Sequence, residues 1–487
     1  MHTDFEQCLR AVQAKDSRFD GWFFTAVLTT GIYCRPSCPA VPPKRKNIVF
    51  HSTAASAQAA GFRACKRCRP DASPGSPEWD SRGDLVARAV RLIADGVVDR
   101  DGVPGLSARL GYSRRQLERL LHDELGAGPL GLARAQRAQT ARLLIETTGL
   151  PMADVAFAAG FGSIRQFNDT VRDVFATTPG DLRTRAKLQL PPAKGTVSVR
   201  LPFRAPLFPD NLFGHLAATA VPGVEEWRDG AYRRTLRLPH GSGVVALTPT
   251  PEHIRCTLRL QDLRDLSVAI ARCRRLLDLD ADPVAVDALL AEDPLLEPLV
   301  RKAPGRRVPR TTDERELAIR AVLGQQVSTA AARTLAGRLV RALGEPVDDD
   351  TLTHLFPTAE AVAQGADHLA MPRSRRDTVL LLSRALAGGD VDLDPGADRH
   401  EARAQLAALK GIGPWTVETI AMRALGDPDA FLSTDLGVVT LAATLGLGKS
   451  ELIPHAERWR PWRAYAVQHL WALGDHPVNT MPTGGTG

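Results

Sequence analysis

The sequence predicts a multidomain fold that is mainly α-helical, with smaller α+β parts. The chain has 487 residues, several times the ~100 to 200 residues of a usual domain. Two turn-rich stretches without an apolar period, Pro70–Gly83 and Lys187–Thr196, interrupt it. A period of 3.6 residues dominates between them and again from Asp313 onward. The domains are therefore expected at residues 1–73, 84–185, 198–300 and 301–480.

The composition is ordinary for globular domains, but the charge is uneven. Hydrophobic residues make up 44% of the chain and charged residues 24%, which is enough apolar material for several cores. The net charge of the chain is +7. Residues 1–190 hold 27 Lys and Arg against 19 Asp and Glu, so this part carries the whole excess of positive charge. Such a basic part is typical of binding to a polyanion, although a solvated basic surface gives the same count.

No segment of the sequence predicts a membrane span or a leader. The first ten residues contain Asp4 and Glu6 and lack the apolar core of a signal peptide. No later segment has the ~20 consecutive apolar residues of a transmembrane helix. These features predict a cytoplasmic protein.

Four of the seven cysteines have the spacing of a metal site. Three residues separate Cys34 from Cys38, two separate Cys65 from Cys68, and 26 residues lie between the pairs. Four thiolates in two close pairs suit tetrahedral Zn²⁺ with no open position, and the remaining cysteines are isolated. The pattern predicts one zinc ion in the first domain, and by spacing alone a purely structural role is favoured.

The residues around the cysteines favour a chemical role instead. FFTAVLTTGIYCRPSC from Phe23 and AGFRACKRCRPD from Ala60 resemble the amino-terminal domain of the Ada family of bacterial alkylation-response proteins. In that family the first cysteine of CRPSC accepts a methyl group from a methylated DNA phosphate, which implies that Cys34 is the acceptor and the other three are supporting ligands. Zinc keeps the sulfur as the attacking thiolate, and a thioether product implies one turnover. The basic residues expected to hold neighbouring phosphates are Lys44, Arg45, Lys46, Lys66, Arg67 and Arg69.

Two similar segments, Leu106–Leu120 and Val155–Val171, repeat in the second domain. Each predicts a short helix, a glycine turn, a serine cap and a second helix, which is a helix-turn-helix unit. The pair resembles the AraC-type DNA-binding domain, and this implies that both second helices enter the major groove. A helical spacer that no longer reads DNA is the alternative. The expected base-reading residues are Arg114, Arg115, Gln116, Arg165, Gln166 and Asn168.

The third region begins with alternating, strand-like runs and continues with helices. The expected strands are Thr196–Leu201, Tyr232–Leu238, Val244–Thr248 and His253–Leu260, around helices at about 210–220 and 265–277. This is a small α+β subdomain. From Asp313 onward the 3.6-residue period predicts a helical bundle.

A helix-hairpin-helix is expected within that bundle. Leu409 closes one helix, Gly411 and Gly413 allow the positive φ angles of a tight turn, and Pro414 suits the first turn of the next helix. The first amides of a helix have no internal partner, so the hairpin can aim them at a phosphate. Asp435 follows at the start of another helix, directly after the possible caps Ser433 and Thr434. An Asp in this context is more often a plain helix cap than a functional residue.

The hairpin, Asp435 and the sequence ERWRPWRAY from Glu457 resemble the AlkA-type 3-methyladenine DNA glycosylases. The resemblance extends back through LAIRAVLGQQVS from Leu317 and covers roughly residues 198–476. It implies an AlkA-like α+β subdomain next to a glycosylase bundle, with Asp435 as the catalytic residue. It also implies that Trp415 and Trp471 line the pocket for a flipped base, that Trp459 and Trp462 are core residues, and that Gln326 fills the vacated base stack.

Residues that differ from those of relatives exclude some of the reactions and cofactors of those relatives. Glycosylases that also cut the strand use a Lys just after the hairpin, where this chain has Trp415. No cysteine occurs beyond Cys273, which excludes the iron-sulfur cluster of some relatives. The family example has a tyrosine four positions after the hairpin tryptophan, where this chain has Thr419. The sequence therefore leaves the width of the base pocket undecided. No PCHR motif occurs, so the second methyltransferase domain of Ada is replaced by the glycosylase.

We therefore expect a fused alkylation-damage protein. It would combine a zinc-dependent methyl acceptor, an AraC-type regulator and a monofunctional glycosylase for methylated purines. Its partners would be double-stranded DNA, both alkylated and promoter DNA, with RNA polymerase as a further candidate, and the chain is expected to be a monomer. The competing hypothesis is a non-enzymatic regulator whose glycosylase region only binds DNA.

Overall fold

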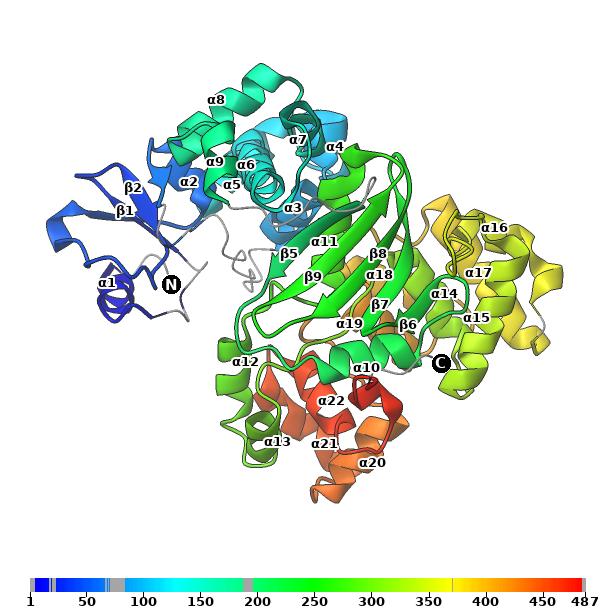
Figure 1. Ribbon diagram of the computed structural model, residues 1–487. Helices are drawn as coiled ribbons and strands as arrows, with labels where there is room; N and C mark the ends of the chain where they lie inside the picture. Colours follow the sequence, from blue (N-terminus) through cyan, green and yellow to red (C-terminus); the bar gives the residue numbers. More distant parts are fainter. Residues whose placement is uncertain are drawn as a thin grey trace.

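The computed structural model describes residues 5–16, 19, 23–65, 68, 70, 84–186, 196–369 and 371–483. The multidomain, mainly helical fold with α+β parts is confirmed (Figure 1). Within the described residues, no single helix is long and apolar enough to cross a membrane, and one pair of helices bent by 93° reaches that length and composition only together.

The amino-terminal part is a small sheet with two helices. The sheet has the strand order β3-β1-β2-β4, in which β2 and β4 are parallel and the other pairs antiparallel. Phe23 and Phe50 pack edge to face beneath the first helix. The elements are α1 (Phe5–Gln13), β1 (Phe24–Val27), β2 (Ile32–Cys34), β3 (Ile48–His51), α2 (Ala54–Ala59) and β4 (Arg63–Ala64).

The next part is helical and contains two helix-turn-helix units. The turns pass through Gly111 (φ +73°) and Gly160 (φ +85°), left-handed conformations that glycine adopts readily. Ser113 and Ser163 cap the second helix of each unit, as the sequence predicts. The helices are α3 (Asp84–Ala94), α4 (Val97–Leu110), α5 (Arg114–Leu125), α6 (Pro129–Thr147), α7 (Met152–Ala158), α8 (Ile164–Phe175) and α9 (Pro179–Arg185).

A five-stranded antiparallel sheet with the order β5-β9-β8-β7-β6 follows. Four of its strands match the expected runs, whereas β6 was not predicted because its four residues, Glu225–Arg228, are polar apart from Trp227. The remaining elements are β5 (Thr196–Pro202), α10 (Asp210–Ala218), β7 (Ala231–Leu238), β8 (Gly241–Pro249), β9 (His253–Leu260) and α11 (Leu266–Leu276).

Helices complete the chain, and one core joins them. That core runs from Val221 to Leu470 and includes residues of α12 and α13, the two helices directly before Asp313. The helices are α12 (Pro283–Leu290), α13 (Glu297–Lys302), α14 (Glu314–Leu323), α15 (Thr329–Leu343), α16 (Ala359–Gln364), α17 (Arg373–Gly388), α18 (Arg399–Ala407), α19 (Pro414–Arg423), α20 (Leu436–Thr444), α21 (Lys449–Ala456) and α22 (Arg463–Trp471).

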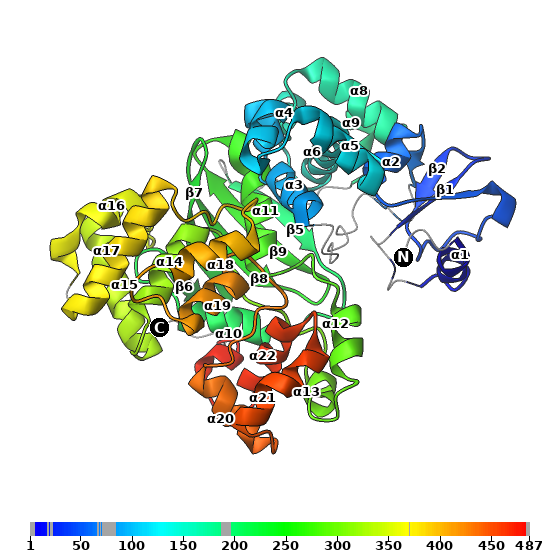
Figure 2. The ribbon, with the colours of Figure 1, turned by 180° about the vertical axis from the view of Figure 1, so that it is seen from behind.

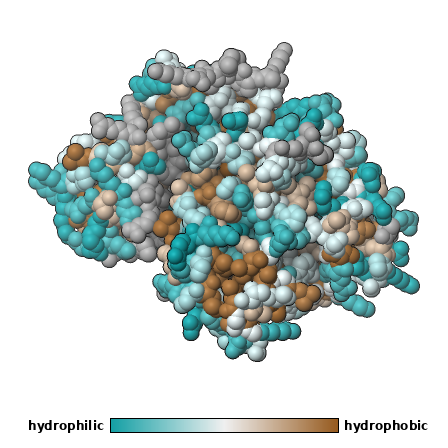
Figure 3. All heavy atoms as spheres, turned by 60° about the horizontal axis from the view of Figure 1, so that its bottom comes forward, coloured by the Kyte–Doolittle hydropathy of each residue, from teal (hydrophilic) through white to brown (hydrophobic). Residues whose placement is uncertain are grey.

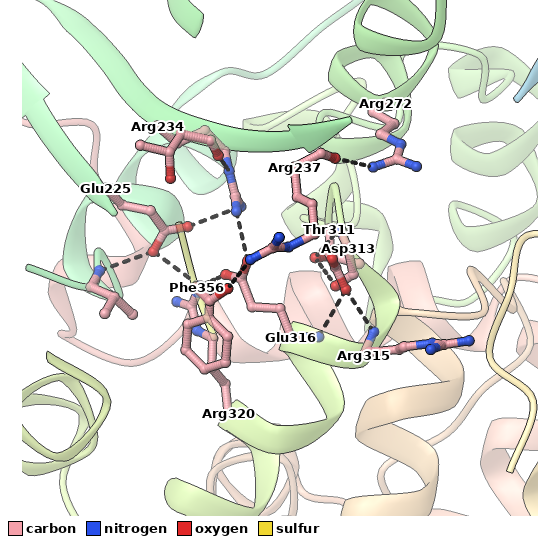
Figure 4. Close-up of polar contacts among 12 residues, drawn as sticks. Glu225, Arg234, Arg237, Arg272, Thr311, Asp313, Arg315, Glu316, Arg320 and Phe356 are labelled. Carbon is pink, nitrogen blue, oxygen red and sulfur yellow. Dashed lines mark hydrogen bonds and ion pairs between the residues drawn. The ribbon is translucent and has the colours of Figure 1, made fainter. Parts of the chain in front are cut away.

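A buried ion-pair network ties the sheet to α14 (Figure 4). Arg234 of β7 is 3% exposed and pairs with Glu225 of β6 at 3.2 Å and with Glu316 of α14 at 2.7 Å. Arg320, one turn further along α14, pairs with both carboxylates. Because buried charges are tolerated only when paired, the network fixes α14 against the sheet.

The parts separated by the predicted linkers also pack on one another. Side chains of α6, α7 and α8 share a core with the five-stranded sheet and α11. On the other side (Figure 2), α3 contacts the segment that leads into α18: Arg88 Nε and Arg91 Nε donate to the carbonyl oxygens of Gly396 and Pro395, both at 2.6 Å. The helix-turn-helix part is thus fixed to the sheet and to a loop of the helical part.

Candidate functional site

The four clustered cysteines meet at the edge of the small sheet. Cys34 ends β2, and Cys65 follows β4, whose parallel pairing with β2 brings the two sequence motifs together. Cys65 N donates to Tyr33 O and Cys38 N to Arg35 O, which fixes both turns. The four Sγ atoms lie within 4.8 Å of one another, as tetrahedral metal coordination requires.

The thiols of this cluster influence one another strongly. Contact with Cys38 first, and then with Cys65 and Cys68, raises the pKa of Cys34, whereas contact with Cys34 lowers the pKa of Cys65. Four thiolates cannot coexist so closely without a cation, so the donor set fits Zn²⁺ and the predicted zinc site is confirmed. Cys34 is half-buried, whereas the other three are buried, so Cys34 is the ligand that an outside molecule can approach.

The basic residues predicted around the cluster differ in whether neighbouring side chains hold them in place. Lys44 and Lys46 are exposed. Arg45 is also exposed, but it forms an ion pair with Glu6 and lies over the ring of Phe5 at 5.2 Å, so α1 holds it in place. Lys66, Arg67 and Arg69 lie outside the described residues.

The second helices of the two helix-turn-helix units present arginines to solvent. Arg114 and Arg115 are exposed on α5, and the Arg165 side chain is 94% exposed on α8. The two glutamines contribute to helix caps, because Gln116 Oε1 accepts from Ser113 N and Gln166 Oε1 accepts from Gly162 N. Asn168, one turn into α8, is half-buried.

The predicted hairpin joins α18 to α19, and only one of its two glycines has a positive φ. Gly411 has φ +90°, and a Cβ there would lie 2.1 Å from Thr378 Oγ1. Gly413 has φ −90° and caps α19, so the expectation of a second positive φ was wrong. Apart from its two chain neighbours, no described residue has an atom within 4 Å of where a Gly413 Cβ would be, so the protein's own packing does not require this glycine.

Asp435 is itself the N-cap of α20, in place of the expected caps Ser433 or Thr434. Its Oδ1 accepts from Val438 N at 2.9 Å and from Trp471 Nε1 at 3.0 Å, and its Oδ2 accepts from Trp415 Nε1 at 2.8 Å. The hairpin helix and the last helix thus bring both predicted pocket aromatics to the half-buried carboxylate. Indole and backbone N–H groups only donate, so all three bonds complement its negative charge.

A buried arginine that the sequence did not single out stands behind this group. The Arg423 guanidinium lies 5.6 Å from the centroid of the Trp471 ring and donates to Nε2 of His215 in α10. Burial and, to a lesser extent, the charge of Arg320 lower the pKa of Arg423 to about 10, although the charge of Asp435 opposes this shift. Burial also lowers the pKa of His215 well below its usual value, so this ring is neutral and can accept.

Gln325, the neighbour of Gln326, connects the loop after α14 to the hairpin. Gln325 Nε2 donates to Gly411 O at 3.1 Å and to Thr416 Oγ1 at 2.8 Å. Gln326 has φ +57°, an unusual conformation for a residue other than glycine that often marks a functional site. Thr419 lies one turn after Trp415, and its buried hydroxyl has no hydrogen-bond partner among the described residues.

Two other tryptophans are core residues, as expected. Trp459 is 1% exposed and donates to Asp293, and Trp462 is buried in the same core. Other apolar residues, in contrast, reach the surface, and apolar side chains gather in places on the face drawn in Figure 3. Leu436, which follows Asp435 and begins α20, is 82% exposed, and Ile453 of α21 is 53% exposed.

Three family profiles match consecutive parts of the chain. The metal binding domain of Ada matches residues 7–71, a helix-turn-helix domain matches residues 106–185, and the AlkA N-terminal domain matches residues 198–313.

Individual relatives match the chain as well. A probable bifunctional transcriptional activator/DNA repair enzyme AlkA of Mycobacterium tuberculosis is 63% identical over 99% of both chains. DNA-3-methyladenine glycosylase 2 of Escherichia coli is 34% identical over 53% of this chain and 92% of its own. The solved 3-methyladenine DNA-glycosylase of Archaeoglobus fulgidus superposes with a TM-score of 0.50 at 21% identity, covering 56% of this chain and 97% of its own, which supports the fold.

Proposed function

Because the chain belongs to the family of bifunctional transcriptional activators and DNA repair enzymes, we propose that it excises alkylated purines, accepts methyl groups from DNA phosphates and regulates transcription. The observation that carries the glycosylase assignment is the Asp435 carboxylate, held by the indoles of Trp415 and Trp471 beside the hairpin. A carboxylate framed by aromatic rings suits a flipped base and the sugar that it leaves.

The hairpin would supply the grip on the DNA strand. Gly413 has no side chain at the start of α19, and apart from its chain neighbours no described atom lies within 4 Å of where its Cβ would be. A phosphate can bind there through backbone N–H groups and the helix dipole. Since Trp415 follows in the first turn of α19, a strand bound in this way would lie next to Asp435.

The chemistry proposed for Asp435 is electrostatic. A purine alkylated at N3 or N7 is already cationic, so it leaves as a neutral base when the N-glycosidic bond breaks, and the positive charge passes to the sugar. The carboxylate would stabilise that charge and orient the water that adds to the sugar. The products are the free base and an abasic site in an intact strand.

The residue after the hairpin supports the proposal of a monofunctional enzyme. Strand cleavage by relatives requires a Lys amine that forms a Schiff base with the sugar, and Trp415 occupies that position. Borohydride should therefore trap no covalent adduct with alkylated DNA, and strand breaks should appear only after alkali. A trapped adduct would contradict this assignment.

Methyl transfer is proposed for Cys34, the half-buried member of the cysteine cluster. Its thiolate sulfur would attack the methyl carbon of a methylphosphotriester, forming the S–CH₃ bond as the C–O bond breaks and the phosphodiester anion leaves. Bound Zn²⁺ keeps the sulfur deprotonated at neutral pH. Lys44 and Lys46 are free to hold the flanking phosphates.

The regulatory role rests on the two helix-turn-helix units. Arg114, Arg115 and Arg165 are exposed on the second helices, where they can contact guanine edges in the major groove. Gln116 and Gln166 would read bases only by giving up their cap contacts. We propose that these units direct the protein to promoter DNA.

Release of 3-methyladenine from alkylated DNA tests the glycosylase assignment. Wild-type protein should release the base, Asp435→Asn should reduce the rate at least about 100-fold, and DNA binding should persist. Asp475→Asn, an exposed carboxylate beyond α22, is the matched control and should be fully active. No release by wild-type protein would favour the non-enzymatic regulator, and full activity of Asp435→Asn would overturn the assignment of the carboxylate.

A further inference from the structure

We propose that Arg423 and Gly437 are positioning residues that hold the Trp471 indole so that its N–H meets the Asp435 carboxylate. This inference rests on the proposed role of Asp435. It gives Trp471 a second task besides base stacking, and it includes the α+β subdomain, through His215, in the construction of the active site.

The three donors to Asp435 differ in how they are fixed. Val438 N belongs to the helix that Asp435 caps, and Trp415 is in the first turn of the hairpin helix. Trp471 comes from the end of α22, the last helix. Its indole is half-buried, so contacts outside its own helix must set its orientation.

Arg423 supplies one of these contacts. It is 8% exposed, yet in the described part of the chain it forms no salt bridge, which is an unfavourable situation for a guanidinium. Its position is explained by the flat face of Trp471, against which it lies, and by the acceptor nitrogen of His215. With one face of the ring covered, a base can stack only on the opposite face.

Gly437 leaves the space in which the Trp471 N–H and the Asp435 carboxylate meet. It lies in the first turn of α20, where alanine would favour the helix more. A Cβ at this position would be 3.0 Å from Asp435 Oδ1 and 3.3 Å from Trp471 Nε1. These contacts are tighter than ordinary van der Waals distances, so a side chain here would require the carboxylate or the indole to shift by a few tenths of an ångström. Such a shift would disturb the hydrogen bond between the two groups.

Gly437→Ala is the decisive variant. It should lower kcat for base release by about tenfold or more and leave KM for alkylated DNA within about threefold, because the carboxylate rather than the DNA grip is disturbed. The melting temperature should not fall, since alanine is the better helix former. Gly388→Ala in α17, where the nearest atom outside the helix is 3.6 Å away, is the matched control and should keep wild-type kcat.

A double-mutant cycle identifies the partner. Trp471→Phe retains a ring but removes the N–H, so adding Gly437→Ala should cost much less in this background than in the wild type. Arg423→Lys should retain more kcat than Arg423→Met. Wild-type kcat in Gly437→Ala, or independent effects in the double variant, would overturn the inference. An inactive Asp435→Asn beside a fully active Gly437→Ala would overturn this inference alone, whereas an active Asp435→Asn would overturn the proposed function with it.

Discussion

Cys34 is distinguished from its three neighbours by exposure, and this gives a test at the level of a single residue. Cys34→Ala should abolish methyl uptake while three buried thiolates retain zinc, whereas Cys65→Ala should lose the metal. Labelled methylphosphotriester DNA measures uptake, which should stop at one methyl per wild-type chain, and atomic emission measures zinc. Methyl uptake by the Cys34→Ala protein would place the acceptor elsewhere.

His469 in α22 predicts an acid-sensitive helical part. It is 1% exposed, neither ring nitrogen has a hydrogen-bond partner among the described residues, and burial and Arg306 lower its pKa to about 3. The unfolded chain takes up a proton near pH 6.5 and the folded chain does not, so stability is full above that pH and is lost as the pH falls. Between pH 7 and pH 5 the loss should be about 2 kcal/mol.

Urea unfolding of wild-type and His469→Phe proteins at both pH values measures that loss. The phenyl ring fills a similar volume and does not titrate, so the pH dependence of the variant should be smaller by the same amount. An equal decrease in stability for both proteins would mean that other groups cause the acid sensitivity.

At the scale of elements, the two hairpin glycines should behave in opposite ways. Gly411→Ala should destabilise the fold by about 1 to 3 kcal/mol, because it combines a positive φ with a clash at Thr378. The Cβ of Gly413→Ala meets no described atom beyond its chain neighbours, so this variant should unfold like wild type. It should nevertheless weaken binding to an abasic duplex about tenfold by blocking the phosphate site. Thermal melts and fluorescence anisotropy separate these effects; unchanged DNA affinity in Gly413→Ala would argue against the hairpin as a grip.

The same elements show how much of the fold and of the site could be predicted from the sequence. Periodicity and caps located both helix-turn-helix units and the hairpin because Ser113, Ser163 and Gly411 act within their own segments. Arg423 and His215 were not found, since their contact joins segments about two hundred residues apart and neither has a local signature. The hydrogen bonds from Trp415 and Trp471 to Asp435 were missed for the same reason. Resemblance placed the tryptophans in a pocket, but not the direction of their N–H groups.

For the molecule as a whole, the contact between α3 and the segment before α18 connects the helix-turn-helix part to the helix that leads into the hairpin. Leu92 packs against Gly396, and Asp398 caps α18 two residues later. Replacing Arg88 and Arg91 by Ala should loosen this segment, raise hydrogen exchange in residues 394–413 and raise KM for base release several-fold at constant kcat. Arg384→Ala on the surface of α17 is the control; unchanged exchange in the double variant would mean that the two parts are independent.

The small domain that holds the cysteine cluster also contacts the helix-turn-helix part. A change of charge at Cys34 should therefore alter DNA affinity. Thr53 Oγ1 donates to Leu125 O at 3.0 Å, which joins α2 to the end of the helix that carries Arg114. Zn²⁺ with four thiolates has net charge −2, and methylation of Cys34 leaves −1. Removing a unit charge at about 4 to 8 Å from a phosphate is worth roughly 2 to 4 kcal/mol at an effective dielectric of about 20, before salt screening.

Even a third of that energy changes affinity several-fold, since ~1.4 kcal/mol is a factor of ten. Methylated protein should therefore bind promoter DNA more tightly than unmethylated protein, and the difference should shrink as salt rises because screening weakens the repulsion. Mobility-shift titrations of both forms at two salt concentrations measure this, with Cys34→Ala, which also removes one negative charge, expected to resemble the methylated form. Equal affinities of the two wild-type forms would show that methyl acceptance and DNA binding are not electrostatically coupled.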